Sequence, residues 1–233
     1  MLVSRLLSCR SRTSWGVALR ALVAALLALG AYVQHSIEGA PPAPLPLVPC
    51  HLESLAEQVL CGVHDVYEDR DAASGRRIPI HVAVLPPLRR SAAPDPLVIM
   101  AGGPGQGARS YAGLAARYFR QVRRSRAIVL VDLRGTGASN PLECPGAQDE
   151  IVALGRGADL FLGSPRDCAS GLDADVRHYT HAAALADLED VRLRLGFDRV
   201  NLWGGSWGTR AALLYALTYP HAVRSLVLDG AVS

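Results

Sequence analysis

An apolar stretch from Val200 to Trp203 runs directly into Gly204-Gly-Ser-Trp-Gly208, and a helical pattern follows from Thr209. A strand, Gly-x-Ser-x-Gly and a helix in this order are typical of a sharp turn that projects a serine hydroxyl from the edge of a sheet. The helix start adds free backbone N–H groups and a positive dipole end beside that serine. The sequence therefore predicts that Ser206 is a nucleophile. The alternative is a glycine-rich turn whose serine only caps the helix.

Strands and helices alternate from residue 97 onward. The predicted strands and helices of this part are Leu97–Met100, Ser110–Arg124, Ala127–Leu133, Thr180–Leu195, Thr209–Tyr219 and Ser225–Asp229, together with the strand before the serine. This alternation predicts an α/β fold with a mostly parallel sheet and helices on both faces. A hairpin of Cys61–Tyr67 and Arg77–Leu85 is expected to add an antiparallel edge, and residues 50–60 to form a short helix or irregular cover.

Three of the predicted strands end in glycine-rich turns, at Gly102, Asp132 and Ser206. The carboxyl ends of parallel strands form the binding crevice of such a sheet. Acyl transfer at a serine also needs two donors at about 3 Å from the developing oxyanion. We predict that the backbone N–H groups of Trp207 and Gly103 are these donors.

The glycine-rich turns allow two other interpretations. The loop Gly102–Gly107 resembles a phosphate- or dinucleotide-binding loop, but it lacks Gly-x-Gly-x-x-Gly, and Pro104 has no N–H to donate. Asp132 and Arg134 are expected to build their own turn rather than to contact substrate.

The first residues have the pattern of a targeting segment. Four arginines and no acid precede an uncharged apolar run, Ala21–Val33, which suits a signal peptide and is short for a span of about 20 residues. We therefore predict that residues 1–36 are a signal peptide, with small residues for cleavage at Ala28–Gly30, or else an uncleaved membrane anchor. Residues 37–49 are expected to be an extended, unpacked proline-rich spacer.

The charge distribution does not point to nucleic acid. All 24 basic residues are arginine, and the 20 that follow the first four are balanced by 21 acids, so we expect no nucleic-acid partner. The arginines near residue 123 are expected to form a solvated face. They are Arg120, Arg123, Arg124 and Arg126.

Cysteine usage favours an exported protein. Cys9 lies in the targeting segment, and the four other cysteines, an even number, allow three disulfide pairings. The short separations favour Cys50–Cys61 and Cys144–Cys168, because short loops are easily closed. A metal site is the alternative, but no C-x-x-C or clustered histidine supports it. We expect neither a metal nor a cofactor.

Three motifs together resemble the α/β-hydrolase family of proline iminopeptidases and tripeptidyl aminopeptidases. They are Ala101-Gly-Gly-Pro-Gly105, Asp132-Leu-Arg-Gly-Thr-Gly-Ala-Ser139 and Gly204-Gly-Ser-Trp-Gly-Thr-Arg210, and the resemblance extends over about residues 50–233. It implies an α/β-hydrolase fold, peptide substrates with a free amino terminus, and Ser206 as the family's nucleophile. Proline iminopeptidases usually carry histidine where Ala101 stands, which argues against strict proline-imino specificity.

The catalytic base and acid are missing from the pattern. The fold's triad runs serine, acid, histidine in chain order, but His221 and Asp229 follow Ser206 in the opposite order. His221 is expected about 20 Å from Ser206 along a helix of 1.5 Å rise per residue. The family places its acid one strand later than Asp229. The other histidines are expected to be structural or surface residues: His51, His64, His81, His178 and His181.

We therefore expect an exported serine hydrolase, an aminopeptidase that forms an acyl-enzyme on Ser206, of which this chain is the N-terminal portion. The acid, the histidine, the cap and the last two strands of the fold would lie beyond Ser233, so the 233 residues alone are expected to be inactive. The last predicted strand would otherwise be an exposed apolar edge, which folded proteins avoid. The alternatives are a carboxylic-ester hydrolase of the same fold and a non-catalytic remnant or peptide-binding module.

Overall fold

The computed structural model describes residues 23, 42–143 and 165–232. The chain divides into two units, Met1–Pro42 and Ala43–Ser233, and every helix and strand named below belongs to the second. Apart from Val23, the predicted targeting segment lies outside the described residues, as does Cys144. No helix within the described residues is both long and apolar enough to cross a membrane.

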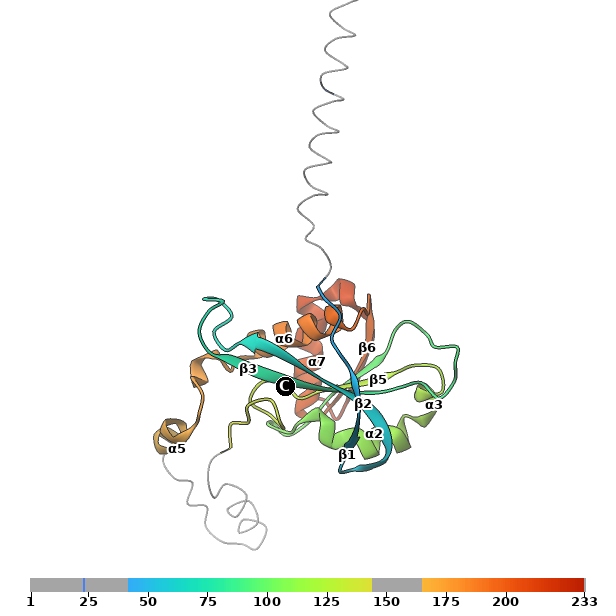
Figure 1. Cartoon of the computed structure of the whole chain (residues 1–233), viewed down its shortest axis with the longest axis horizontal. Helices are drawn as coiled ribbons and strands as arrows, with labels where there is room; N and C mark the ends of the chain where they lie inside the picture. The colour runs from blue at the N-terminus through green and yellow to red at the C-terminus, as the bar shows by residue number, and fades with distance from the viewer. Residues whose placement is uncertain (1–22, 24–41, 144–164, 233) are drawn as a thin grey trace, which may run out of the picture. The chain divides into compact units, whose positions relative to one another are not determined.

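Within the described residues, seven strands form one sheet in the order β1-β2-β3-β5-β4-β6-β7 (Figure 1). The strands are β1 (Val48–Leu52), β2 (Leu55–Tyr67), β3 (Arg77–Leu85), β4 (Leu97–Met100), β5 (Ile128–Val131), β6 (Val200–Gly205) and β7 (Val223–Asp229). The strands β5, β4, β6 and β7 are parallel. The strands β1, β2 and β3 form an antiparallel edge, and β3 also pairs antiparallel with β5. The predicted fold class is confirmed.

The start of this unit is more regular than we predicted. Residues 50–60 are not a helix or irregular cover, because β1 and the first half of β2 pair as a hairpin, with Val48 opposite Cys61. Val59 is buried against the core, and this tertiary contact decides the strand conformation. The structure contains the predicted Cys50–Cys61 disulfide, with the two Cα atoms 5.8 Å apart. The second predicted pair, Cys144–Cys168, stays a prediction.

The end of the proline-rich stretch is packed, although we expected it to be unpacked. Leu45 is buried, and its N–H donates to the carbonyl oxygen of Arg194 at 2.8 Å. The strand β1 then begins at Val48, so folded structure starts before residue 50.

The helices follow the predicted order. They are η1 (Ala108–Tyr111), α2 (Ala112–Tyr118), α3 (Arg120–Arg123), α5 (Pro165–Gly171), η2 (Val176–His178), α6 (His181–Arg194), α7 (Trp207–Thr218) and η3 (Pro220–Ala222). The predicted helix Ser110–Arg124 is interrupted at Phe119, whose backbone leaves the helical conformation. Thr180 caps α6 by accepting the N–H of Ala183, and Gly196 follows its end with a φ of +76°.

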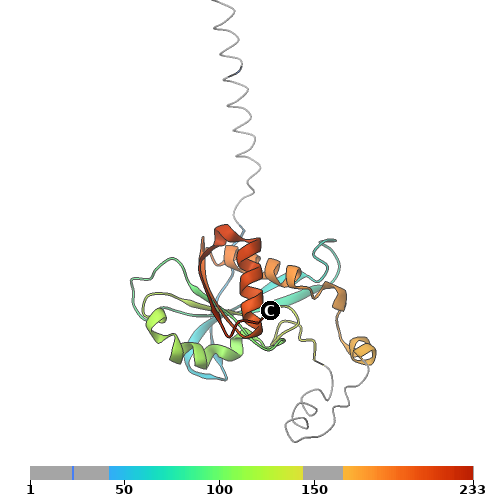
Figure 2. The ribbon, with the colours of Figure 1, turned by 180° about the vertical axis from the view of Figure 1, so that it is seen from behind.

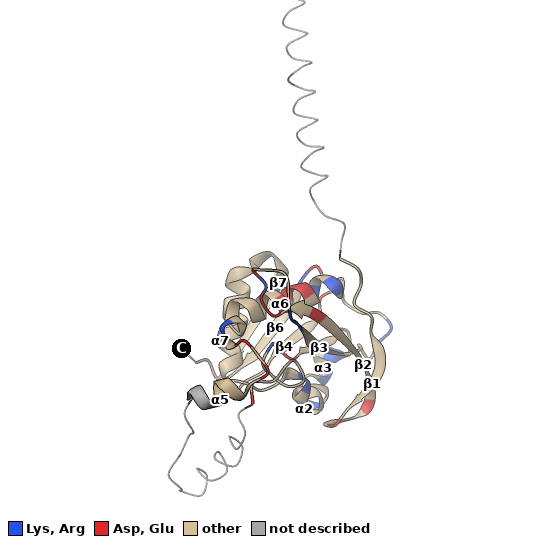
Figure 3. Cartoon of the chain, turned by 60° about the vertical axis from the view of Figure 1, so that its left-hand side comes forward, with Lys and Arg blue, Asp and Glu red and all other residues tan. Residues whose placement is uncertain are grey.

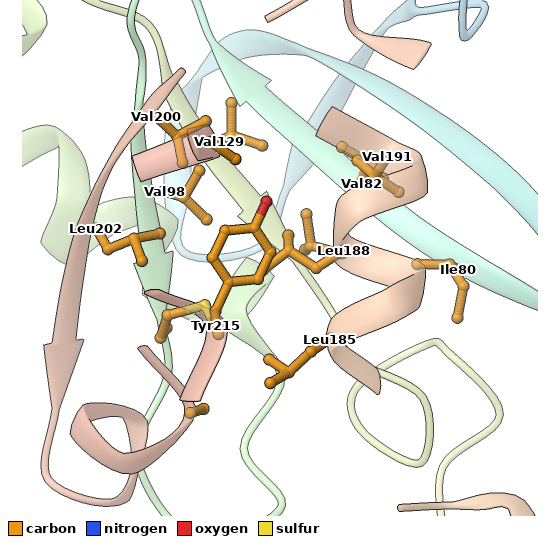
Figure 4. Packing of buried hydrophobic residues seen from close by; sticks show 14 of the residues in the cluster. Ile80, Val82, Val98, Val129, Leu185, Leu188, Val191, Val200, Leu202 and Tyr215 are labelled. Atoms are coloured by element: carbon orange, nitrogen blue, oxygen red, sulfur yellow. The ribbon is translucent and has the colours of Figure 1, made fainter. Parts of the chain in front are cut away.

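Helices cover both faces of the sheet (Figures 1 and 2). Successive side chains of a strand point to opposite faces. Val98 and Met100 of β4 therefore pack with α6 and α7, whereas Leu97 and Ile99 pack with η1 and α2. On the first face the ring of Tyr215 lies among aliphatic side chains (Figure 4), and its hydroxyl donates to Glu189 Oε2 at 2.5 Å.

The arginine cluster is only partly a solvated face. Basic residues mark α2 and α3, which contain no acid (Figure 3). Arg120 and Arg124 are exposed as predicted. Arg123, however, is only 4% exposed; it pairs with Glu57 and donates to a backbone carbonyl. The prediction is wrong for Arg123 and also for Arg126, which pairs with an aspartate, because both side chains fold back onto acceptors distant in sequence.

Candidate active site

Ser206 occupies a strained turn between β6 and α7. Its φ of +51° and ψ of −123° lie in a region that non-glycine residues rarely adopt. Its N–H donates to the carbonyl oxygen of Asp229 at 2.9 Å. Its own carbonyl oxygen accepts from the N–H of Thr209 at 2.9 Å and from the Thr209 hydroxyl at 2.6 Å. Neighbouring elements therefore hold the strained backbone on both sides, and Ser206 is exposed at the carboxyl end of the sheet.

The glycines that flank Ser206 are required by crowding. A Cβ atom on Gly204 would lie 2.5 Å from the carbonyl oxygen of Gly208. A Cβ atom on Gly208 would lie 2.1 Å from the carbonyl oxygen of Met100, at the end of β4. Both distances are too short for real atoms, so the turn can form only with glycine at these two positions. The Gly-x-Ser-x-Gly pattern thus has the physical cause that the sequence suggested.

The glycine-rich loop after β4 lies against this turn. A Cβ atom on Gly102 would be 3.5 Å from the Cβ of Ser206. Tyr111 orders the loop, because its hydroxyl accepts the N–H of Gly102 at 3.2 Å and donates to Gln106 Oε1 at 2.8 Å. Gly103 follows in a left-handed conformation with a φ of +110°. The loop and the turn therefore lie side by side, as two oxyanion donors on them would require.

The first helical residue after the turn places a backbone N–H next to Ser206. Trp207 begins α7, and the first N–H groups of a helix have no acceptor within it. The dipole of α7 places its positive end at the same point. The assignment of the Trp207 and Gly103 N–H groups to the oxyanion stays a prediction.

Asp132 connects the loop after β4 with the loop after β5. Its carboxylate is buried and accepts the N–H of Arg109 at 2.8 Å and the N–H of Ala138 at 3.1 Å. Cβ atoms on Gly107 and Gly137 would approach its oxygens to 2.9 Å and 2.3 Å, which explains the glycines on either side. Asp132 therefore builds the turns, as expected.

Arg134 is committed to a buried ion pair. It binds Asp187 of α6 through two hydrogen bonds of 2.6 Å and 2.9 Å, and both side chains are 0% exposed. The same guanidinium donates to the carbonyl oxygens of Glu68 and His178. Nearby, burial and a hydrogen bond to Glu68 raise the pKa of the Tyr179 phenol to about 12. Sequence reasoning missed Asp187, although an acid on the apolar side of a predicted helix is a signal for a buried partner.

The similarity to known proteins agrees with this geometry. The model of the alpha/beta hydrolase fold family matches residues 95–233, more than half of the chain. The chain belongs to the α/β-hydrolase family. It is 37% identical over 135 residues to the Streptomyces coelicolor protein named "Probable proline iminopeptidase", covering 58% of this chain and 32% of that protein. It is 29% identical over 194 residues to a serine protease of Mycobacterium bovis, covering 74% of this chain and 36% of that protein.

Solved structures also match the chain. The crystal structure of a proline iminopeptidase of Mycobacterium smegmatis matches with a TM-score of 0.46 and 21% identity, over 71% of this chain and 42% of that one. The predicted family resemblance is confirmed. The α/β-hydrolase chain spans about a third of the length of the curated relatives it matches.

The predicted nucleophile, Ser206, has no base beside it in the described part of the chain. Within residues 42–143 and 165–232, no histidine or carboxylate hydrogen-bonds the Ser206 hydroxyl. His221 is 71% exposed and lies 3.9 Å from a Glu189 oxygen. Asp229 is exposed at the end of β7 and contacts Ser206 through its backbone oxygen, so a role as the acid is not established.

One histidine does lie close to the turn. His181, at the start of α6, stacks on the ring of Trp207 with centroids 5.3 Å apart and planes at 29°. Sequence reasoning treated it as an ordinary surface histidine, and His181 is exposed. No spacing in the sequence could have indicated the contact, because the packing of α6 beside α7 creates it. His81 lies on β3 behind the turn after β5, and burial together with the charge of Arg109 lowers its pKa.

Proposed function

We propose that this chain carries the nucleophile of a serine aminopeptidase that acts through an acyl-enzyme on Ser206. The observation that carries the proposal is the strained turn, in which Ser206 is presented beside the free N–H of Trp207 and a glycine-rich loop. Relatives named as a proline iminopeptidase and a serine protease support a peptide substrate with a free amino terminus.

The reaction follows from this arrangement. The Ser206 oxygen attacks the carbonyl carbon of the scissile peptide bond, and a general base accepts the hydroxyl proton. The carbonyl oxygen becomes an oxyanion, to which Trp207 and Gly103 would donate their N–H groups. One such donor contributes about 10²–10³-fold in rate. The C–N bond then breaks, the amine leaves with a proton, and water hydrolyses the resulting ester.

The base and the acid are proposed to lie on other residues of a longer enzyme. The first support is that Ser206 has no histidine or carboxylate partner in the described residues. The second support is the outer edge of the sheet, where Val227 and Leu228 of β7 are 54% and 38% exposed, as expected for a strand that packs against further structure. We propose that the further structure packed against β7 comprises two more strands and a cap. We also propose that the 233 residues alone are inactive.

Export to the periplasm or beyond is proposed for the same protein. The basic start and the apolar run Ala21–Val33 support a signal peptide or an anchor. The Cys50–Cys61 disulfide supports an oxidising compartment. Mass spectrometry of the amino terminus after cell fractionation tests this proposal. A soluble exported chain that begins near Gly30 indicates cleavage, an intact membrane-bound chain indicates an anchor, and an intact cytoplasmic chain contradicts export.

The activity is tested by comparing the 233-residue chain with a chain extended through its downstream coding sequence. Both are assayed with an aminoacyl-anilide, a tripeptidyl-anilide and a simple ester. We expect the extended chain to hydrolyse an anilide, Ser206→Ala to abolish this hydrolysis, and the exposed control Ser91→Ala to leave it unchanged.

Other outcomes contradict particular parts of the proposal. Turnover by the short chain that Ser206→Ala abolishes would show that its base is already present. Hydrolysis of the ester alone would favour the carboxylic-ester hydrolase. A downstream sequence without an aspartate and a histidine would favour the non-catalytic remnant.

A further inference from the structure

A small cavity lies beside the nucleophile turn, between α6, α7 and the turn after β5. Its volume is about 90 Å³. Leu133 lines it from the turn, Ala184 and Leu185 line it from α6, and Trp207 and Ala211 line it from α7. The lining therefore includes aliphatic side chains from the turn and from both helices, together with the aromatic residues Tyr179 and Trp207.

Apart from His181, the polar side chains around the cavity already have partners. The Thr136 hydroxyl donates to the carbonyl oxygen of Leu133 at 2.8 Å, and the Thr180 hydroxyl accepts a backbone N–H in the first turn of α6. Arg134 is held by the buried ion pair, and the Tyr179 hydroxyl binds Glu68 and an asparagine amide. Because these groups are occupied, the cavity offers an apolar environment, and a polar group that entered it would lose hydrogen bonds to water.

Trp207 connects the cavity to the chemistry. Its ring is one wall of the cavity, its backbone N–H begins α7, and it directly follows Ser206. His181, which stacks on this ring, also lines the cavity and is itself exposed. The cavity is therefore open to solvent at His181 and adjoins the residue whose N–H would bind the oxyanion.

We propose that this cavity is a subsite for one small aliphatic side chain of the substrate, on a residue that flanks the scissile bond. The proposal rests on the proposed peptidase function, because it assigns the occupant of the same site. A water molecule takes up about 30 Å³ in the liquid, so 90 Å³ holds about three heavy atoms, the size of a valine side chain. The peptide backbone stays outside the cavity, at the exposed rim formed by His181.

The proposal is tested by binding, which needs no turnover. The full chain is labelled with 5-fluorotryptophan, and the signal of Trp207 is assigned by its loss in Trp207→Phe. N-acetyl-valinamide, N-acetyl-glycinamide and N-acetyl-phenylalaninamide are titrated while the ¹⁹F spectrum is recorded. Each buried methyl or methylene group strengthens binding about fourfold, so we expect the valine probe to bind more than about tenfold tighter than the glycine probe. The phenylalanine side chain is too large and should shift the signal no more than glycine does.

A matched pair of variants tests whether the valine probe binds in the cavity. Ala184→Leu fills the cavity and should weaken the valine probe to the level of the glycine probe. Ala182→Leu adds the same atoms to α6 at an exposed position outside this cavity and should leave the binding unchanged. Equal binding of the three probes to the unmodified chain would overturn the proposal without any variant. Unchanged valine binding in Ala184→Leu would also overturn it.

Failure of the subsite can be separated from failure of the proposed function. Ser206→Ala abolishes the proposed hydrolysis, but it removes no group that lines the cavity, so it should retain valine binding. Hydrolysis of anilides by the extended chain without valine selectivity in the titration would overturn the subsite alone. Selective binding without Ser206-dependent hydrolysis would overturn the peptidase proposal and retain the site.

Discussion

The polar groups at the two ends of the parallel strands differ: those at the amino ends are hydrogen-bonded to one another, and the Ser206 hydroxyl at the carboxyl ends is exposed. At the amino ends, Asn201 of β6 donates to Asp95 Oδ2 at 2.8 Å and accepts from Arg224 and Ser225 of β7 at 2.8 Å and 2.6 Å. Arg126 donates to the same aspartate from the segment before β5. One network therefore ties the starts of β5, β6 and β7 to the chain before β4.

At the carboxyl ends the same strands leave groups exposed. Ser206 is strained, and its hydroxyl has no hydrogen-bond partner among the described residues. The buried groups that stabilise this end are the ion pair of Arg134 and Asp187 and the carboxylate of Asp132. The difference indicates that the amino ends contribute stability, while the carboxyl ends keep the Ser206 hydroxyl exposed at the expense of stability.

The largest expected effect is on the free energy of unfolding, and it comes from breaking the buried ion pair of Arg134 and Asp187. Asp187→Ala removes the partner of Arg134 and leaves a buried guanidinium unpaired, which should lower the free energy of unfolding by about 3–5 kcal/mol. Urea denaturation followed by circular dichroism measures the loss. The control is Asp175→Ala, whose partner Arg177 is exposed, and it should have little effect. Equal losses in the two variants would show that the buried pair does not brace this end.

The next effect tests the network at the amino ends through pH. Burial raises the pKa of Asp95, but hydrogen bonds from Asn201 and Arg126 and the charge of Arg224 outweigh burial, and the pKa is about 2. The folded pKa lies below the unfolded value of about 3.9, so the stabilisation is present above about pH 5 and is lost as the pH falls toward 2. The loss should amount to about 2 kcal/mol.

This pH dependence is measured from urea midpoints between pH 6 and pH 2. Asp95→Asn cannot titrate, so its stability should fall less steeply over this range than that of the unmodified chain. Parallel curves for the two proteins would show that the network does not hold the Asp95 carboxylate in its charged form.

The smallest expected effect compares one serine at each end. Ser206→Gly should raise the free energy of unfolding by about 1 kcal/mol, because glycine adopts the strained conformation at little cost and part of this gain is offset by chain entropy. Ser225→Gly should lower it by about 1 kcal/mol, because the hydrogen bond to Asn201 is lost and glycine weakens the strand. Changes of the same sign would remove the contrast between the ends.

Much of the scaffold could be predicted from local patterns. Four consecutive apolar residues predicted β4, which the structure places at Leu97–Met100. The helix predicted over Thr180–Leu195 is α6, which spans His181–Arg194. The nucleophile turn was also evident, because the crowding at Gly204 and Gly208 leaves only one residue type for each position.

Features that depend on partners far along the chain could not be predicted in this way. Residues 50–60 became strands only through pairing and through burial of Val59 against the other face of the sheet. Arg123 became a buried residue because Glu57 lies opposite it. Local propensity carries no information on such contacts, since they depend on which elements become neighbours.

The sequence by itself determined the order of strands and helices, the nucleophile turn at Ser206 and the family, because glycine spacing and apolar runs act over a few residues. Tertiary structure alone decided that Arg134 binds Asp187 and that His181 stacks on Trp207 beside a small apolar cavity. These contacts join segments that only the packing of α6 against the sheet and α7 brings together. The turn at Ser206 is therefore predictable from local sequence, whereas the shape of the proposed subsite beside it depends on how the helices pack.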